Sequence, residues 1–207
     1  MKKYISRFHY LTQDMPGRSH VEQVNIACAA GANWIQYRCL TKTDAELITE
    51  INQIAAICDD WGTTLILTQH YHLLDRVDAQ GVHIENVNTD LAEVRQIIGD
   101  NKTLGASAIT AERVLKLQEA GVVDYCGFGP YAHNDIKLNN YPFLGIARYR
   151  ELKEHSITLP IIAVGGIQLQ DVNTLMETGI DGIAVSGAIN NAADPAEMFK
   201  AFYKKLY

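Results

Sequence analysis

The chain has 207 residues, 47% of them hydrophobic and 20% charged, with a net charge of −6. Its length and apolar content allow a complete core, and its acidic balance argues against a nucleic-acid partner, which needs a basic surface. The N-terminus lacks the apolar run of a signal peptide, and no stretch approaches the roughly 18 apolar residues of a membrane span. We therefore expect a cytoplasmic protein without membrane or nucleic-acid partners.

Short apolar runs alternate with amphipathic stretches along the whole sequence. The runs predict eight strands, at Phe8–Thr12, Trp34–Arg38, Thr64–Thr68, Gly81–Ile84, Thr103–Ala106, Asp124–Gly127, Ile161–Val164 and Gly182–Ser186. The amphipathic stretches predict eight helices, at Val21–Ala30, Asp44–Asp60, Tyr71–Asp78, Leu91–Ile98, Ala111–Ala120, Ile146–Glu154, Leu169–Glu177 and Pro195–Lys205. Regular βα units in this number predict a closed (β/α)₈ TIM barrel, with an open doubly wound sheet as the alternative.

No linker, low-complexity tract or block of charge divides the chain, so we expect a single domain over residues 1–207. A glycine followed by Asn or Asp recurs where helices give way to strands, as in Ala30-Gly31-Ala32-Asn33 and Thr178-Gly179-Ile180-Asp181. Glycine at such a joint supplies the left-handed residue that ends a helix. The four cysteines form neither a Cys-x-x-Cys pair nor a dense framework, so we interpret them as reduced and structural rather than as disulfide or zinc ligands: Cys28, Cys39, Cys58 and Cys126.

Two glycine-rich turns follow the last two predicted strands. Gly165 and Gly166 end the apolar run at residues 161–164, and Ser186 and Gly187 end the run at residues 182–185. Glycine turns expose backbone N–H groups, and a following helix N-terminus adds partial positive charge. In a barrel of this type the two turns would form one phosphate cup.

Polar residues at other predicted strand ends are candidates for the same site. Gln36 and Arg38 stand two apart on one strand, so both point toward the barrel interior or its mouth. An inward arginine needs an anion, either a ligand or a carboxylate from a neighbouring strand. We predict substrate binding by Gln36 and Arg38, together with Ser107 and Lys137.

Histidines supply the candidates for proton transfer. His83 ends the fourth strand, where it either bonds across the barrel top or fills it, and Ser107 either donates to a phosphate or caps the next helix. His133 and Lys137 lie in the long loop after the sixth strand, which has the length of a lid. A loop histidine can move a proton near neutral pH, although such residues are more often only solvated. His70 and His72 are spaced wrongly for chelation from one helix face.

Four segments resemble the superfamily of thiamine phosphate synthase and TenI-type thiazole tautomerase. They are Gln36-Tyr37-Arg38, Gly81-Val82-His83-Ile84, the turn from Asp124 to Pro130 with Lys137 after it, and Leu159 to Ile167. In the synthase branch, the resemblance implies, hydroxymethylpyrimidine pyrophosphate ionises with Mg²⁺ holding the pyrophosphate, and the nitrogen of a thiazole phosphate captures the cation. The expected ligands are therefore a thiazole phosphate and, in that branch, a pyrimidine pyrophosphate.

The positions that bind metal in the family depart from its pattern here. Thr68, Gln69 and Asn88 align with the family's metal residues, so no carboxylate remains at those positions, and Mg²⁺ favours carboxylate oxygens. We predict no protein metal site, and Mg²⁺ as a cofactor only if the synthase reaction is retained. Asp90, two residues from the aligned position, could substitute if its loop shifts.

Three functions stay open at this point. A synthase with a remodelled metal site stands first, followed by a tautomerase that moves a proton and by a non-catalytic phosphate binder. The tautomerase histidine aligns with Ile109, so in that branch His133 or His83 would carry the proton, with Arg38 beside them. A homodimer is a further open alternative.

Overall fold

The computed structural model describes residues 3–133 and 142–207. Eight parallel strands close into a barrel in chain order, which confirms the predicted (β/α)₈ architecture. The strands are β1 (Phe8–Leu11), β2 (Trp34–Tyr37), β3 (Thr64–Thr68), β4 (Gly81–Ile84), β5 (Thr103–Ala108), β6 (Tyr125–Phe128), β7 (Ile161–Val164) and β8 (Gly182–Val185).

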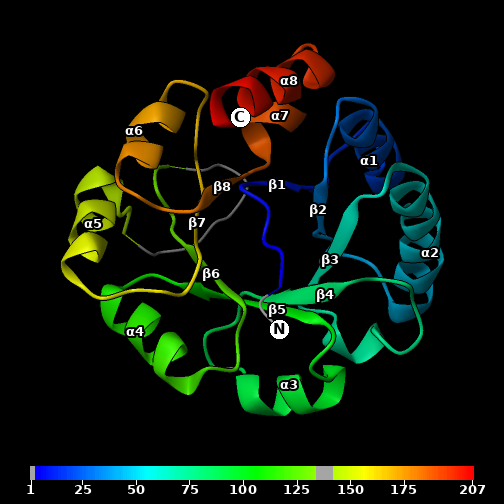
Figure 1. The fold of residues 1–207 in the computed structure, drawn as a ribbon. Coiled ribbons are helices and arrows are strands. Elements are labelled where there is room, and N and C mark those ends of the chain that lie inside the picture. The colour runs from blue at the N-terminus through cyan, green and yellow to red at the C-terminus, as the bar shows by residue number, and fades with distance from the viewer. Residues whose placement is uncertain (1–2, 134–141) are drawn as a thin grey trace.

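The helices surround the barrel, with β1 beside β8 where the cylinder closes (Figure 1). They are α1 (His20–Ala29), α2 (Asp44–Trp61), α3 (Leu91–Ile98), α4 (Ala111–Ala120), α5 (Gly145–Glu151), α6 (Asp171–Glu177), α7 (Gly187–Asn190) and α8 (Pro195–Leu206), with 3₁₀ turns at Tyr71–Leu73 and Leu152–Glu154. Within the described ranges, none of these helices combines the length and apolar character that crossing a membrane requires.

Two elements differ from the sequence prediction. The helix expected at Tyr71–Asp78 is only a 3₁₀ turn at Tyr71–Leu73 followed by irregular turns. Residues 69–80 must return the chain along the length of a strand, and single turns suffice to bury Leu73, Leu74 and Val77. The short helix α7 was not predicted, because four residues are too few to show a helical period.

The barrel interior is filled by alternate residues of the strands, as the pleat requires. An apolar cluster of large and small side chains occupies it, formed by Leu11, Trp34, Ile66, Tyr125, Ile162 and Ala184. His9 lies within this interior, fully buried, and stacks on Trp34 with ring centroids 4.4 Å apart. A second and larger core separates the barrel from the helices.

The glycine joints at the amino-terminal ends of the strands have the geometry that the sequence predicted. Gly31 and Gly179 have positive φ angles of 101° and 82° directly after helices α1 and α6. The aspartate that follows such a glycine holds the neighbouring strand, since Asp181 accepts the N–H of Ile161 at 2.8 Å. Asp124 accepts the N–H of Leu104 in the same way. These contacts build the end of the barrel opposite the candidate site.

Candidate active site

A pocket of about 420 Å³ opens at the carboxyl ends of the strands, where polar residues and glycines from several strands meet. Its lining includes Thr12, Arg38, Glu85, Ser107, His133 and Ser186, together with the glycine turns after β7 and β8. The volume is that of a small-molecule site. Sequence candidates from five different βα units, those of β2, β5, β6, β7 and β8, therefore line one cavity.

The turn after β7 requires glycine at both of its positions. Gly165 and Gly166 have φ angles of 94° and 71°, which side chains rarely adopt. A Cβ on Gly165 would lie 2.8 Å from Pro130 Cβ, and one on Gly166 would lie 2.4 Å from the carbonyl oxygen of His133. Both glycines line the pocket, so the turn brings bare backbone close to whatever occupies it.

The turn after β8 opens directly into helix α7. The Ser186 hydroxyl donates to Gln13 Oε1 at 3.0 Å and accepts from Asn190 Nδ2 at 3.2 Å. Gly187 and Ala188 line the pocket from the first turn of α7, where backbone N–H groups have no partner within the helix. The two glycine turns thus face the same cavity with backbone donors, an arrangement suited to an anion.

Gln36 and Arg38 point to the same side of β2, as predicted, but they end in different surroundings. Gln36 is buried inside the barrel, where its Nε2 donates to Thr68 Oγ1 at 2.9 Å. Arg38 reaches the pocket and forms an ion pair with Glu85, Nε to Oε1 at 3.1 Å and a terminal guanidinium nitrogen to Oε2 at 3.3 Å. The arginine therefore has a protein carboxylate as its anion, contributed from beyond β4 rather than from an adjacent strand.

A hydrogen-bonded chain crosses from the barrel interior to the pocket. Tyr125 OH lies 3.0 Å from His83 Nδ1, and His83 Nε2 lies 3.0 Å from Ser107 Oγ, which lines the pocket. Burial raises the pKa of the Tyr125 phenol, so this group stays protonated and can donate to the histidine. Ser107 lies within β5, and the N-cap of α4 is Thr110, so the predicted alternative of Ser107 as a helix cap is wrong.

Two glycines make room for this chain. A Cβ on Gly105 would lie 2.2 Å from the Tyr125 ring, and one on Gly127 would lie 2.9 Å from His83 Cε1. Because neither glycine has a side chain, there is room for the Tyr125 ring and the His83 imidazole. His83 itself is 5% exposed and reaches the cavity through the serine.

The loop after β6 brings His133 to the pocket rim, where its ring packs edge-on against Phe143 at 5.4 Å between centroids. Ile109, at the position that the sequence resemblance aligns with the tautomerase histidine, also lines the pocket. Lys137, a predicted substrate-binding residue, lies outside the described residues.

The family model described as "Thiamine monophosphate synthase" matches residues 10–189. The chain belongs to the thiamine monophosphate synthase family. This membership confirms the resemblance seen in the sequence.

Curated relatives agree over nearly the whole length. A thiamine-phosphate synthase of Phocaeicola vulgatus is 36% identical over 94% of this chain and 95% of its own. One from Flavobacterium johnsoniae is 31% identical over 98% of this chain and 97% of its own. Among solved structures, thiamine phosphate pyrophosphorylase from Pyrococcus furiosus has a TM-score of 0.85 and 25% identity, over 97% of this chain and 95% of that one.

The side chains of Thr68 and Gln69, two of the three positions that the sequence resemblance aligns with metal residues of the family, bond within the protein. Thr68 accepts from Gln36, and the Gln69 side-chain oxygen accepts the N–H of Glu85 at 3.0 Å. Asn88 is exposed and does not line the pocket. Asp90 is the N-cap of α3, and its carboxylate accepts the backbone N–H groups of Ala92 and Glu93. This carboxylate is therefore engaged in capping the helix.

Sequence reasoning missed Glu85 and Gln13. Glu85 follows directly after Gly-Val-His-Ile in the sequence, and a charged residue at that strand end was the available signal. Gln13 follows Thr12, one residue beyond the candidate strand end, and its bond to Ser186 links the first strand to the last.

Proposed function

We propose that this chain acts in thiamine biosynthesis as a thiamine-phosphate synthase. It would join a hydroxyethylthiazole phosphate to a hydroxymethylpyrimidine pyrophosphate, with a new C–N bond replacing the C–O bond to the departing pyrophosphate. One observation carries the proposal: two glycine turns suited to phosphate face one pocket in a chain that the family model matches over residues 10–189. The names of the curated relatives point to the same reaction.

The thiazole phosphate fits the side of the pocket formed by the ends of β7 and β8. Gly165, Gly166 and Gly187 offer backbone donors there, and the Ser186 hydroxyl is held in place by Gln13. The phosphate charge would be met by N–H groups and by the partial charge of the α7 N-terminus rather than by a buried cation. Lys137 is expected to add a positive charge from its loop.

The opposite side of the pocket, formed by Arg38, Glu85 and Ser107, is left for the pyrimidine pyrophosphate. Arg38 can bind a pyrophosphate oxygen with two parallel N–H groups once it is turned from Glu85. Ser107, backed by His83, can donate to the same ligand. Binding of this second substrate therefore depends on how strongly the ligand competes with Glu85.

The residues at the aligned metal positions do not fit a Mg²⁺ ion. Thr68 and Gln69 use their side chains inside the protein, and the pocket carboxylate of Glu85 is paired with Arg38. Mg²⁺ in proteins usually takes one or two carboxylates together with substrate phosphates. We therefore assign no step to protein-bound Mg²⁺, and a Mg²⁺ requirement would mean that the ion enters with the pyrophosphate.

One observation supports a second candidate, a proton-transferring tautomerase. The chain from Tyr125 through His83 to Ser107 ends in the pocket and could move a proton, with His133 at the rim as another carrier. If this reading is right, replacing both His83 and His133 with Asn abolishes aromatisation of a thiazole carboxylate phosphate. Unchanged turnover in that double variant would eliminate it.

Titration calorimetry followed by a turnover assay separates these functions. The synthase predicts saturable binding of hydroxyethylthiazole phosphate, then release of one pyrophosphate per thiamine phosphate formed when hydroxymethylpyrimidine pyrophosphate and Mg²⁺ are added. Binding of the thiazole alone, without pyrophosphate release, would reject the synthase in favour of a tautomerase or a non-catalytic binder. Binding of neither compound would reject all three.

A further inference from the structure

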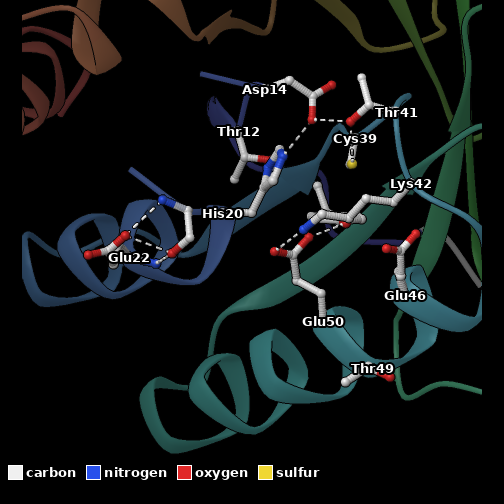
Figure 2. A network of polar contacts seen from close by, with 12 residues as sticks. Thr12, Asp14, His20, Glu22, Cys39, Thr41, Lys42, Glu46, Thr49 and Glu50 are labelled. Atoms are coloured by element: carbon white, nitrogen blue, oxygen red, sulfur yellow. Dashed lines mark hydrogen bonds and ion pairs between the residues drawn. The ribbon is translucent and has the colours of Figure 1, made fainter. Parts of the chain in front are cut away.

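Three different metal-binding groups meet beside the pocket, between the loops that follow β1 and β2. Asp14 lies in the loop before α1, His20 is the first residue of α1, and Cys39 follows β2 by two residues. One ligand atom from each lies within 4.8 Å of the others. Figure 2 shows the three side chains facing one another, with Thr12 and Thr41 at the edges of the group.

We propose that Asp14, His20 and Cys39 form a binding site for a thiophilic divalent cation of the zinc class. The carboxylate, imidazole and thiolate would supply three ligands, and a water molecule the fourth. A sulfur ligand together with a histidine nitrogen selects zinc-like ions over Mg²⁺, which prefers oxygen donors. The site is thus distinct in chemistry from the Mg²⁺ of the family reaction, and it does not rest on the proposed function.

Each ring nitrogen of His20 has an oxygen partner, so one of its two tautomers would suit a metal ligand. His20 Nδ1 lies 2.8 Å from Thr12 Oγ1, and the same hydroxyl accepts the backbone N–H of Arg38 at 3.0 Å. If Nδ1 donates to the hydroxyl, Nε2 is left with its lone pair directed at Asp14. Metal-bound histidines typically donate their other N–H to a protein oxygen, which fixes both tautomer and ring orientation.

The contact between His20 and Asp14 is one that a bound cation could replace. Nε2 lies 3.1 Å from Asp14 Oδ1, so either a proton or a cation must stand between a ring nitrogen and a carboxylate that both otherwise accept. The Leu40 backbone N–H donates to Asp14 Oδ2 at 3.2 Å and the Thr41 hydroxyl donates to Oδ1 at 3.1 Å. These two donors orient the carboxylate within the group.

The positive charge of Lys42, which acts on both Cys39 and Asp14, is balanced by a carboxylate outside the group. Lys42, in the same loop as Cys39, is paired with Glu50, its Nζ 2.6 Å from Oε1. Glu50 also accepts from Tyr37 OH, so both residues have partners outside the Asp14 group. On binding, the cation would displace the proton between His20 and Asp14 and a proton from the Cys39 thiol, both of which pass to solvent.

The distances allow coordination after a small contraction. Zinc bonds of roughly 2.0 to 2.3 Å place tetrahedral ligand atoms about 3.3 to 3.8 Å apart. The ligand atoms here lie within 4.8 Å of one another, so the widest separation would close by at most about 1.5 Å. Asp14 can make that movement, since its side chain is 33% exposed, while His20 and Cys39 are buried. The same exposure gives an ion a path from solvent.

Co²⁺ titration of the chelator-treated full chain tests the site, because a thiolate bound to Co²⁺ produces an intense charge-transfer absorption. We expect one Co²⁺ per chain with this band, displaced by one equivalent of Zn²⁺. Cys39→Ser should abolish the band, whereas Cys126→Ala, at a buried cysteine of β6, and His72→Asn, at an exposed histidine, should retain it.

The outcome that overturns the proposal is wild-type protein without a saturable sulfur-to-cobalt band, or a Cys39→Ser variant that keeps it. If Cys39→Ser fails to fold, Asp14→Asn at the exposed edge of the group replaces it. That variant should bind Co²⁺ at least tenfold more weakly, and an unchanged affinity would equally reject the site.

Discussion

The ion pair between Arg38 and Glu85 places one positive and one negative charge on the same wall of the pocket. Both side chains are mostly buried, 13% and 16% exposed, so their mutual attraction is stronger than that of a surface pair. An anionic ligand must therefore approach a carboxylate in order to reach the guanidinium. Under the proposed function, the pair would oppose binding of the pyrimidine pyrophosphate.

Glu85→Gln should strengthen binding of inorganic pyrophosphate and of pyrimidine pyrophosphate. Removing the carboxylate frees Arg38 and ends its repulsion of the ligand, a gain of about 1 kcal/mol or roughly fivefold in Kd. Calorimetry compares this variant with Glu119→Gln, which makes the same charge change at an exposed position of α4. Weaker binding with lost turnover would show instead that Glu85 holds the ligand or its Mg²⁺.

Gly166→Ala should remove phosphate binding. A Cβ there would lie 2.4 to 2.6 Å from the carbonyl oxygens of His133 and Ala132, at a φ of 71° that disfavours any side chain. We expect the Kd for hydroxyethylthiazole phosphate to rise at least tenfold, since about 1.4 kcal/mol of binding is enough for that change.

Gly121→Ala is the matched control for that variant. Its φ is also positive, 64°, but nothing lies within 4 Å of the added Cβ, and it ends α4 away from the pocket. It should cost stability through backbone strain while leaving the Kd unchanged. Equal losses of binding in the two variants would mean that strain, rather than the phosphate cup, explains the result.

At the scale of elements, Asp90 caps the N-terminus of helix α3. Its Oδ1 accepts two backbone N–H groups, at 2.9 and 3.1 Å, and so satisfies donors that the helix cannot pair itself. Asp90→Ala should lower stability by about 1 kcal/mol, a fall of roughly 2–4 °C in Tm. Activity and its Mg²⁺ dependence should stay as in the wild type. A selective loss of Mg²⁺-dependent turnover, with Tm unchanged, would restore Asp90 as a metal residue.

Elements with long, regular patterns could be predicted from the sequence. Seven of the eight strands begin at the predicted residue, because apolar runs bounded by turn residues mark where a buried strand starts. The helix expected at Tyr71–Asp78 failed because Leu73, Leu74 and Val77 have a spacing that single turns can bury equally well.

The pocket residues likewise fall into two groups, those that can be recognised from local sequence and those that depend on distant partners. The glycine turns are local features, so Gly165, Gly166 and Gly187 could be found from neighbouring residues alone. Glu85 and Gln13 acquire their partners only when the barrel closes, since Glu85 meets Arg38 across 47 positions and Gln13 meets Ser186 across 173. Such pairs depend on register and closure, which the sequence pattern does not specify.

At the scale of the whole molecule, the barrel axis contains an uncharged histidine. His9 is fully buried, and within the described part of the chain neither of its ring nitrogens has a hydrogen-bond partner. Burial lowers the pKa of His9 to about 3, and the nearby His83 acts in the same direction. The folded barrel therefore resists protonation at its centre.

This histidine should make folding sensitive to acid. In the unfolded chain His9 takes up a proton near its usual pKa of about 6.5, but the folded chain does so only near pH 3, so stability is complete above about pH 6.5 and falls as pH drops toward 3. From this residue alone, the free energy of unfolding should fall by about 2 kcal/mol between pH 7.5 and pH 5.

Urea unfolding of His9→Phe at both pH values isolates that contribution from other titrating groups. The variant keeps a ring against Trp34 and removes two unsatisfied nitrogens, so it should be at least as stable at pH 7.5. Its loss of stability at pH 5 should be smaller than that of the wild type by about 2 kcal/mol. An identical pH dependence in both proteins would show that His9 is accessible to protons when folded.

The aspartates that hold strand starts and the glycines that line the pocket stand at opposite ends of the barrel. Asp181 and Asp124 secure β7 and β5 at one end, while Gly165, Gly166 and Gly187 shape the pocket at the other. Natural variation can therefore alter substrate preference by changes at the pocket end without undermining the fold. Substitutions can therefore accumulate at the pocket end of the barrel while the contacts that anchor the strands at the other end are kept.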